Sequence, residues 1–87
     1  MFADLGFAPE EAENLKVRSD LMIALRRAID GMTQIEAAAL LGVSQPRVSE
    51  LRRGHIDKFT IDTLVNMLAR TGVETRISLR KVRQPAA

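Results

Sequence analysis

Residues 33–54, TQIEAAALLGVSQPRVSELRRG, have the pattern of two short helices joined by a tight turn. Thr33 and Glu36 have the spacing of a capping box, in which each side chain accepts a hydrogen bond from the backbone N–H of the other residue. Gly42 can adopt a positive φ at little cost, so we expect it to end a first helix over residues 34–41.

A second helix follows the turn. Ser44 can cap it, and Pro46 fits its first turn because the N–H that proline lacks has no helical partner there. Val48 and Leu51, three residues apart, share the inward face. A small residue at the helix crossing (Ala38), a glycine in the turn and aliphatic residues beneath are the spacing of a helix-turn-helix.

The flanking residues predict two further helices. Pro9 begins a long amphipathic helix with an apolar residue every three or four positions, up to about Asp30. A break near residues 19–20, which could start a new helix, stays open as an alternative. On the other side, Thr60 caps a helix that Gly72 closes.

The pattern changes to a strict alternation of apolar and polar residues after this last helix, which predicts a half-buried strand. A lone strand leaves its backbone donors and acceptors unpaired, and the rest of the chain offers no comparable strand. We therefore predict antiparallel pairing with the strand of a second copy, which makes the protein a homodimer. The predicted dimerisation residues are Val73, Thr75, Ile77 and Leu79.

These patterns predict a mainly α fold: a helix-turn-helix bundle of four to five helices with a C-terminal β-strand that pairs across a dimer. The chain has 87 residues, enough for one domain with a thin core. We divide it into an N-terminal arm (1–8), a helix-turn-helix DNA-binding domain (9–72), a C-terminal dimerisation strand (73–83) and a tail (84–87).

The composition argues against several classes of function. The absence of cysteine excludes disulfides and thiolate metal sites. No apolar run approaches the roughly 18 residues of a membrane span, and the first residues are acidic rather than basic as in a signal peptide. We therefore expect a cytoplasmic protein that contacts no membrane. The single histidine, His55, has no triad or metal spacing around it, so we expect no enzyme activity, no catalytic residue, no metal site and no cofactor.

Charge is distributed unevenly along the chain. Residues 1–30 hold six acidic and four basic residues, a balance of −2, whereas residues 31–87 hold nine basic and five acidic residues, a balance of +4. A basic surface that includes the helix-turn-helix fits an anionic partner such as double-stranded DNA.

The central stretch resembles the helix-turn-helix of the XRE (Cro/C1-type repressor) family, in particular its short antitoxin-like members related to HigA. The run Gly-Val-Ser-Gln-Pro-Arg-Val-Ser at residues 42–49 carries most of this resemblance, and the flanking helices agree with it. The resemblance implies a lambda-repressor-like fold and a transcriptional repressor. It also implies the pairing of an antitoxin with a RelE/HigB-like ribonuclease toxin.

The second helix of the motif presents polar side chains that could read the major groove. Gln45 could pair with adenine, and Arg47 with guanine or a phosphate. Glu50 could accept from cytosine or brace a neighbouring arginine, and both alternatives stay open. Pro46 is limited to van der Waals contact, for example with a thymine methyl. The predicted DNA-binding residues are Gln34, Ser44, Gln45, Pro46, Arg47, Ser49, Glu50 and Arg53; the resemblance implies this role for Gln34, Ser44, Gln45 and Glu50.

Two functions from different classes follow. In the first, a dimeric repressor reads an inverted repeat through the helix at residues 44–53, because a two-fold dimer presents two recognition helices to successive major grooves. In the second, the protein acts mainly as an antitoxin that binds a toxin, with the N-terminal arm and the first helix as the binding surface. A free-standing regulator without a toxin is the further alternative.

Overall fold

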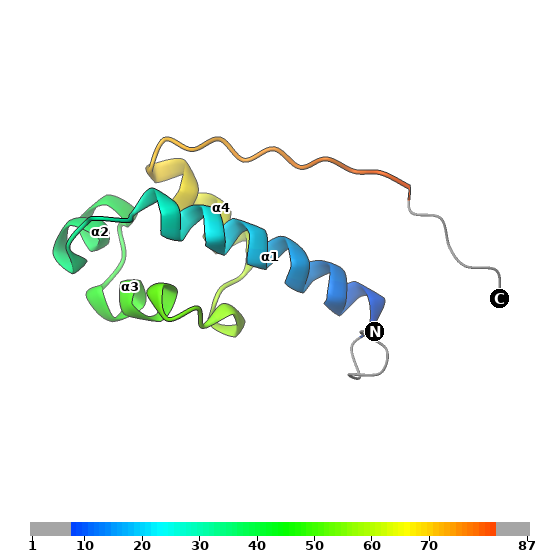
Figure 1. Ribbon diagram of the computed structural model, residues 1–87, viewed down its shortest axis with the longest axis horizontal. Helices are drawn as coiled ribbons and strands as arrows, with labels where there is room; N and C mark the ends of the chain where they lie inside the picture. Colours follow the sequence, from blue (N-terminus) through cyan, green and yellow to red (C-terminus); the bar gives the residue numbers. More distant parts are fainter. Residues whose placement is uncertain (1–7, 82–87) are drawn as a thin grey trace.

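The computed structural model describes residues 8–81, which form four α-helices and one 3₁₀ turn (Figure 1). In chain order these are α1 (Pro9–Ala28), α2 (Gln34–Leu41), α3 (Gln45–Arg52), η2 (Ile56–Lys58) and α4 (Ile61–Arg70). The prediction of a mainly α helix-turn-helix bundle is confirmed. The predicted tail and all but the last residue of the predicted arm lie outside the described residues.

Helix α1 is a single uninterrupted helix, so the alternative of a break near residues 19–20 is wrong. Pro9 lies in its first turn as predicted. The helix ends at Ala28 rather than Asp30, because Ile29 already leaves the helical conformation and Gly31 then turns the chain with a φ of 85°. Its N-terminal end extends beyond the other helices (Figure 1).

The local signals of the helix-turn-helix are confirmed. The Thr33 hydroxyl accepts from the Glu36 N–H at 3.1 Å, and the Glu36 carboxylate accepts from the Thr33 N–H at 2.9 Å. Gly42 has a φ of 70° and donates its N–H to the Ala38 carbonyl at 2.9 Å, which closes α2. The Ser44 hydroxyl accepts from the backbone N–H of Arg47, the third residue of α3, at 3.4 Å.

One hydrophobic core lies between the four helices. Helix α1 packs most extensively against α4, α2 packs against α3, and α4 also contacts α2. The two inward residues predicted for α3 are fully buried. The core residues are Met22, Leu25, Ile29, Ala37, Ala38, Leu41, Val48, Leu51, Phe59, Leu64, Met67 and Leu68.

The predicted C-terminal strand is not confirmed. Residues 8–81 contain no β-strand, and residues 73–81 leave α4 as an extended chain (Figure 1). Val73, Ile77 and Leu79, which were expected to be half-buried, are exposed. The physical reason is that a strand needs a neighbour to accept and donate its backbone hydrogen bonds, and the helical body of this chain supplies none.

Candidate nucleic-acid interface

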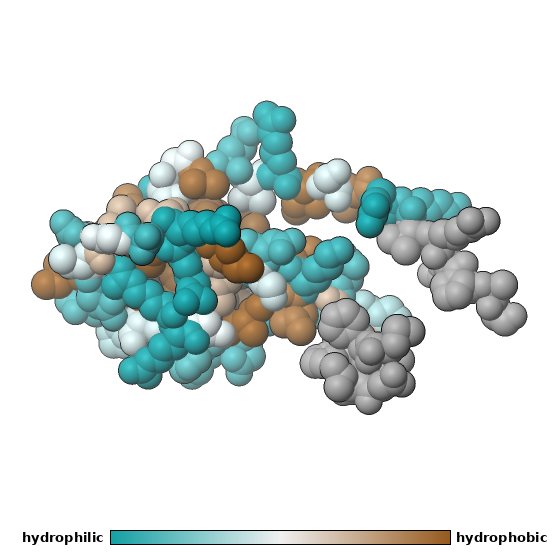
Figure 2. Space-filling model, viewed as in Figure 1, coloured by the Kyte–Doolittle hydropathy of each residue, from teal (hydrophilic) through white to brown (hydrophobic). Residues whose placement is uncertain are grey.

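Helix α3 places one face in the core and leaves the opposite face on the surface. Gln45, Ser49 and Arg53 follow one another at intervals of four residues, with Pro46 beside them, and all but the half-buried Ser49 are exposed. We call these four residues the outer stripe of α3. Figure 2 shows a largely hydrophilic surface over this part of the molecule. The outer stripe therefore projects polar groups from a helix whose other side is fixed by the core.

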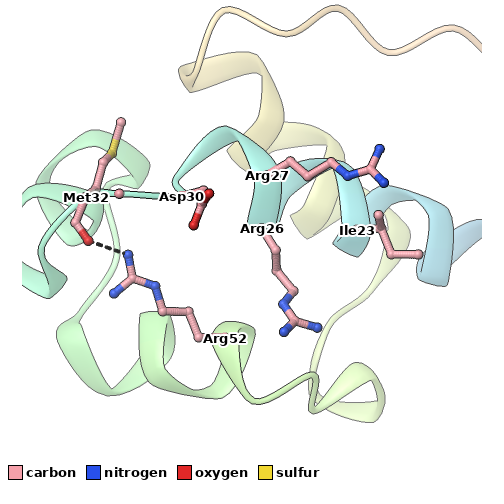
Figure 3. Close-up of a pocket in the computed structure, with 7 residues that line it drawn as sticks. Ile23, Arg26, Arg27, Asp30, Met32 and Arg52 are labelled. Atoms are coloured by element: carbon pink, nitrogen blue, oxygen red, sulfur yellow. Dashed lines mark hydrogen bonds between the residues drawn. The ribbon is translucent and has the colours of Figure 1, made fainter.

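Arg52, at the end of α3, holds the helix-turn-helix together. Its guanidinium donates to the Met32 carbonyl at 2.7 Å, to the Gln34 side-chain oxygen at 2.8 Å and to the Ile29 carbonyl at 3.3 Å. Figure 3 shows the bond to Met32. A single side chain thus joins α3 to the end of α1, the loop after it and the start of α2. We call this arrangement the Arg52 clamp.

Gln34 takes part in the same network. Its amide donates to the Gln45 backbone carbonyl at 3.1 Å while its oxygen accepts from Arg52. The Gln34 side chain therefore links the start of α2 to the start of α3. Both polar ends of the amide have partners within the domain, and the side chain is half-buried. The side chain of Gln45 itself stays exposed.

Arg47 lies on the other flank of α3 rather than on the outer stripe. Its guanidinium stacks over the buried Phe59 ring, 4.2 Å from the ring centroid, and donates to a Glu50 oxygen at 3.2 Å. The second Glu50 oxygen lies 3.4 Å from the Lys58 ammonium. In the structure the Glu50 carboxylate therefore contacts two cations, Arg47 and Lys58.

The surroundings of Glu50 favour its charged form. The hydrogen bond from Arg47 is the largest cause that lowers the pKa of this carboxyl below its ordinary value, with Lys58 adding to it and partial desolvation opposing it. Glu50 is therefore a carboxylate at neutral pH. It fixes the direction of two cations beside α3.

A contact from α4 stabilises the turn of the motif. Arg70 donates its Nε–H to the Leu40 carbonyl at 2.9 Å, one of the carbonyls left unpaired at the end of α2. Its guanidinium lies against Gly42, where a Cβ atom would come within 3.0 Å of it. Gly42 is thus favoured by its positive φ, and a side chain there would also displace the Arg70 guanidinium by a few tenths of an ångström.

An open pocket of about 590 Å³ lies between the end of α1 and the end of α3. Figure 3 shows Arg26 directed toward the end of α3 and Arg27 pointing away from it. The Arg26 guanidinium passes close to Gly54, which follows the C-cap of α3. Arg53, on the outer stripe, is one residue before Gly54. The basic side chains of Arg26 and Arg53 therefore lie on the pocket side of the outer stripe.

Not all predicted site residues lie together. The structure brings together Gln45, Pro46, Ser49 and Arg53 on the outer stripe, with the exposed Ser44 at its start. Gln34, Arg47 and Glu50 are held in contacts within the domain. The sequence analysis did not predict the Arg52 clamp, the Phe59 stack or the Arg70 contact. Helical spacing gives a signal for the first two, because Arg52 follows the buried Val48 by four positions and Arg47 precedes the buried Leu51 by four.

Within residues 8–81 no group of three histidine, aspartate or glutamate side chains is arranged to hold a metal ion. The same residues contain no helix with the length and apolar character needed to cross a membrane. The outer stripe of α3 exposes amide, hydroxyl and guanidinium groups, which donate and accept hydrogen bonds.

Comparisons with known proteins agree with this geometry. Residues 1–80 match the helix-turn-helix domain family HTH_37. A solved structure described as an XRE family transcriptional regulator is similar at a TM-score of 0.75 and 35% sequence identity, over 87% of this chain and 89% of that one. No curated protein matches at a significant level. The chain therefore belongs to the helix-turn-helix domain family and is a DNA-binding transcriptional regulator of the XRE type.

Proposed function

We propose that the protein is a dimeric repressor that reads an inverted repeat through the outer stripe of α3. One observation carries the proposal: α3 is fixed on its inner side by two fully buried aliphatic residues and at its end by the Arg52 clamp, while its outer polar groups have no partners among the described residues. A rigid helix with free hydrogen-bonding groups is suited to the major groove.

Each residue of the outer stripe has a chemistry suited to one kind of contact. The Gln45 amide can form two hydrogen bonds with the N6 and N7 atoms of adenine, and Pro46 can contact a thymine methyl. Ser49 can donate to or accept from either kind of base pair. Arg53, with Arg26 on the neighbouring wall, can meet phosphates at the side of the groove. The half-site is therefore expected to contain A·T pairs where the start of α3 lies.

The inverted repeat follows from two-fold symmetry. In a homodimer joined through residues 73–81, two copies of α3 stand on the same side of the particle, about 34–36 Å apart, if they enter successive major grooves. Sedimentation should then give twice the chain mass of 9.6 kDa at micromolar concentration. A folded particle of single chain mass would contradict the dimer.

A binding titration tests the DNA contact. We expect a specific mobility shift with a duplex covering the protein's own promoter. The Gln45→Ala variant should lose about 1–3 kcal/mol of specific affinity at fixed salt, the range for one bidentate base contact. Because Gln34 bonds only the backbone of Gln45, this change leaves the helix-turn-helix network intact.

Asn66→Ala serves as the matched control, since Asn66 is an exposed amide on α4, outside the predicted interface. It should bind as the wild type does. Equal affinities for the wild type and Gln45→Ala, with normal melting of both, would show that the outer stripe does not read bases.

We infer a second role, as the antitoxin of a toxin–antitoxin pair, from the charge of α1. Its first twelve residues carry four exposed carboxylates, on Glu10, Glu11, Glu13 and Asp20, away from the basic side of α3. This acidic surface suits a small basic protein such as a RelE/HigB-like ribonuclease. Co-expression with the product of an adjacent reading frame should give a complex that reversal of these charges dissolves. Growth arrest unaffected by the wild-type chain would contradict this role.

A further inference from the structure

The extended segment after α4 has two chemically different faces. Val73, Ile77 and Leu79 are 40%, 64% and 89% exposed, and they share one face with Thr75 and Lys81. Glu74, Arg76, Ser78 and Arg80 share the other face. Figure 2 shows hydrophobic and hydrophilic residues side by side along this segment. The Glu74 carboxylate already accepts from Arg76 of its own chain at 2.8 Å, both side chains being largely exposed.

Two-fold symmetry restricts how this segment can pair with its copy. In an antiparallel ladder, directly opposed residues point to the same face. A two-fold axis perpendicular to the ladder maps each face onto itself, so it must pass midway between one residue and the same residue of the other copy. The candidate centres are therefore whole residues, and each centre fixes all the other pairs.

Charge decides among the six centres at residues 74–79: three of them oppose like charges, and the centre at residue 79 gives no opposite-charge pair. A centre at residue 74 opposes Glu74 to its own copy, and a centre at residue 76 does the same to Arg76. A centre at residue 78 opposes Arg76 to Arg80 twice. Like charges directly opposite one another destabilise a ladder. Centres at residues 75 and 77 each give two opposite-charge pairs and no like-charge pair.

Ladder length decides between the two that remain. Gly72, with a φ of 85°, and the end of α4 prevent the strand from extending before Val73. A centre at Thr75 therefore pairs only residues 73–77 and leaves the most exposed apolar side chain, Leu79, without a cross-strand neighbour. A centre at Ile77 pairs the whole of residues 73–81.

The longer register also brings the apolar residues together. Leu79 lies opposite the partner's Thr75, and Ile77 lies opposite its own copy. The aliphatic stem of Lys81 can cover the partner's Val73 at the end of the ladder. In this register Leu79 of each copy lies nearer to the helical domain of the other copy.

We propose that the segment at residues 73–81 is a self-pairing strand with one register, centred on Ile77, in which Glu74 of each copy pairs with Arg80 of the other. This inference rests on the proposed dimer and adds the register to it. The occupant of the extended face is a second copy of this chain, selected by the complementarity of Glu74 and Arg80 across the two-fold axis.

Cysteine cross-linking measures the register directly, because the chain has no native cysteine. In the proposed ladder the two copies of residue 77 have Cα atoms about 4.5–5.5 Å apart, within disulfide reach. Copies of residue 76 are diagonal neighbours at about 7–8 Å, beyond that reach, and copies of residue 75 are farther apart. Of Thr75→Cys, Arg76→Cys and Ile77→Cys, only the last should form a covalent dimer rapidly under mild oxidation by diamide.

The cross-linking pattern and the mass in solution test the register and the dimer separately. Faster cross-linking of Thr75→Cys or Arg76→Cys would overturn the register but leave the dimer in place. A dimeric mass under reducing conditions with no cross-link from any variant would place the interface elsewhere. Single chain mass for the wild type would overturn the dimer and with it the register.

A charge exchange gives an independent readout. Glu74→Arg and Arg80→Glu should each weaken dimerisation about tenfold or more, because each change replaces two attractive cross-strand pairs by two repulsive ones. The double variant should recover most of the wild-type affinity. Recovery by Glu74→Arg with Arg76→Glu instead would indicate the shorter register.

Discussion

Replacing Arg52 by methionine should destabilise the domain without removing a DNA contact. Methionine keeps an unbranched apolar stem but cannot donate to the acceptors at 2.7, 2.8 and 3.3 Å. A hydrogen bond contributes about 0.5–1.5 kcal/mol net, and these acceptors are only partly buried, so the loss should be about 2 kcal/mol. For a domain of this size that corresponds to a fall in Tm of about 10 °C.

Arg53→Met is the matched control, because it makes the same substitution one residue later, at an exposed side chain of the outer stripe. It should change the free energy of unfolding by less than about 0.5 kcal/mol. Calorimetry or circular dichroism on both variants measures this difference.

The salt dependence of DNA affinity should show the reverse pattern, with an effect of Arg53→Met and none of Arg52→Met. If Arg53 meets a phosphate, Arg53→Met should reduce the slope of log affinity against log salt by about one. Arg52→Met, measured well below its Tm, should keep the wild-type slope. Wild-type melting of Arg52→Met, or a reduced salt slope in that variant, would refute the assignment of Arg52 as an internal clamp.

Three further changes test the packing around α3. Gly42→Ala should lower the free energy of unfolding by about 1–2 kcal/mol for the left-handed conformation, plus the cost of displacing Arg70. Gly31→Ala imposes a similar backbone strain in open space, so urea denaturation should show a smaller loss for it. Equal losses for the two variants would contradict the Arg70 contact. Phe59→Ala should cost about 3–5 kcal/mol by opening a cavity, and a near-normal Tm would be incompatible with its burial. Since the pKa of Glu50 is lowered in the fold, its stabilising effect should be present above the ordinary value of 4.5 and vanish as the pH falls through the lowered value. The unfolding free energies of the wild type and Glu50→Gln should therefore converge in acid, and a gap that persists there would show that charge is not its source.

Sequence reasoning succeeded where the determinants are local. Thr33, Gly42, Ser44 and Thr60 each act on backbone groups within a few residues, so caps and helix ends could be predicted closely. The inward side of α3 followed from helical spacing alone. The separation of the site into outer stripe and internal braces did not.

The reason is that the braces depend on segments distant in the sequence. Arg52 bonds to three separate positions between Ile29 and Gln34, and Arg47 stacks on Phe59 beyond the end of α3. Both arginines are four residues from a buried residue of α3, which puts them at the edge of its buried face. That spacing distinguishes them from Arg53, although it does not identify their partners. The predicted C-terminal strand was not observed for a related reason, because the neighbour expected to pair with it belongs to a second molecule.

The most direct test of the DNA-binding surface places a cleavage reagent on α3. An iron chelate attached to the Gln45→Cys variant, bound to its operator duplex, should cut at two centres about 10–10.5 base pairs apart, one in each half-site. The same chelate on Asn66→Cys should cut little. A single cleavage centre, or equal cutting from both positions, would contradict a two-fold pair of α3 helices lying in successive major grooves.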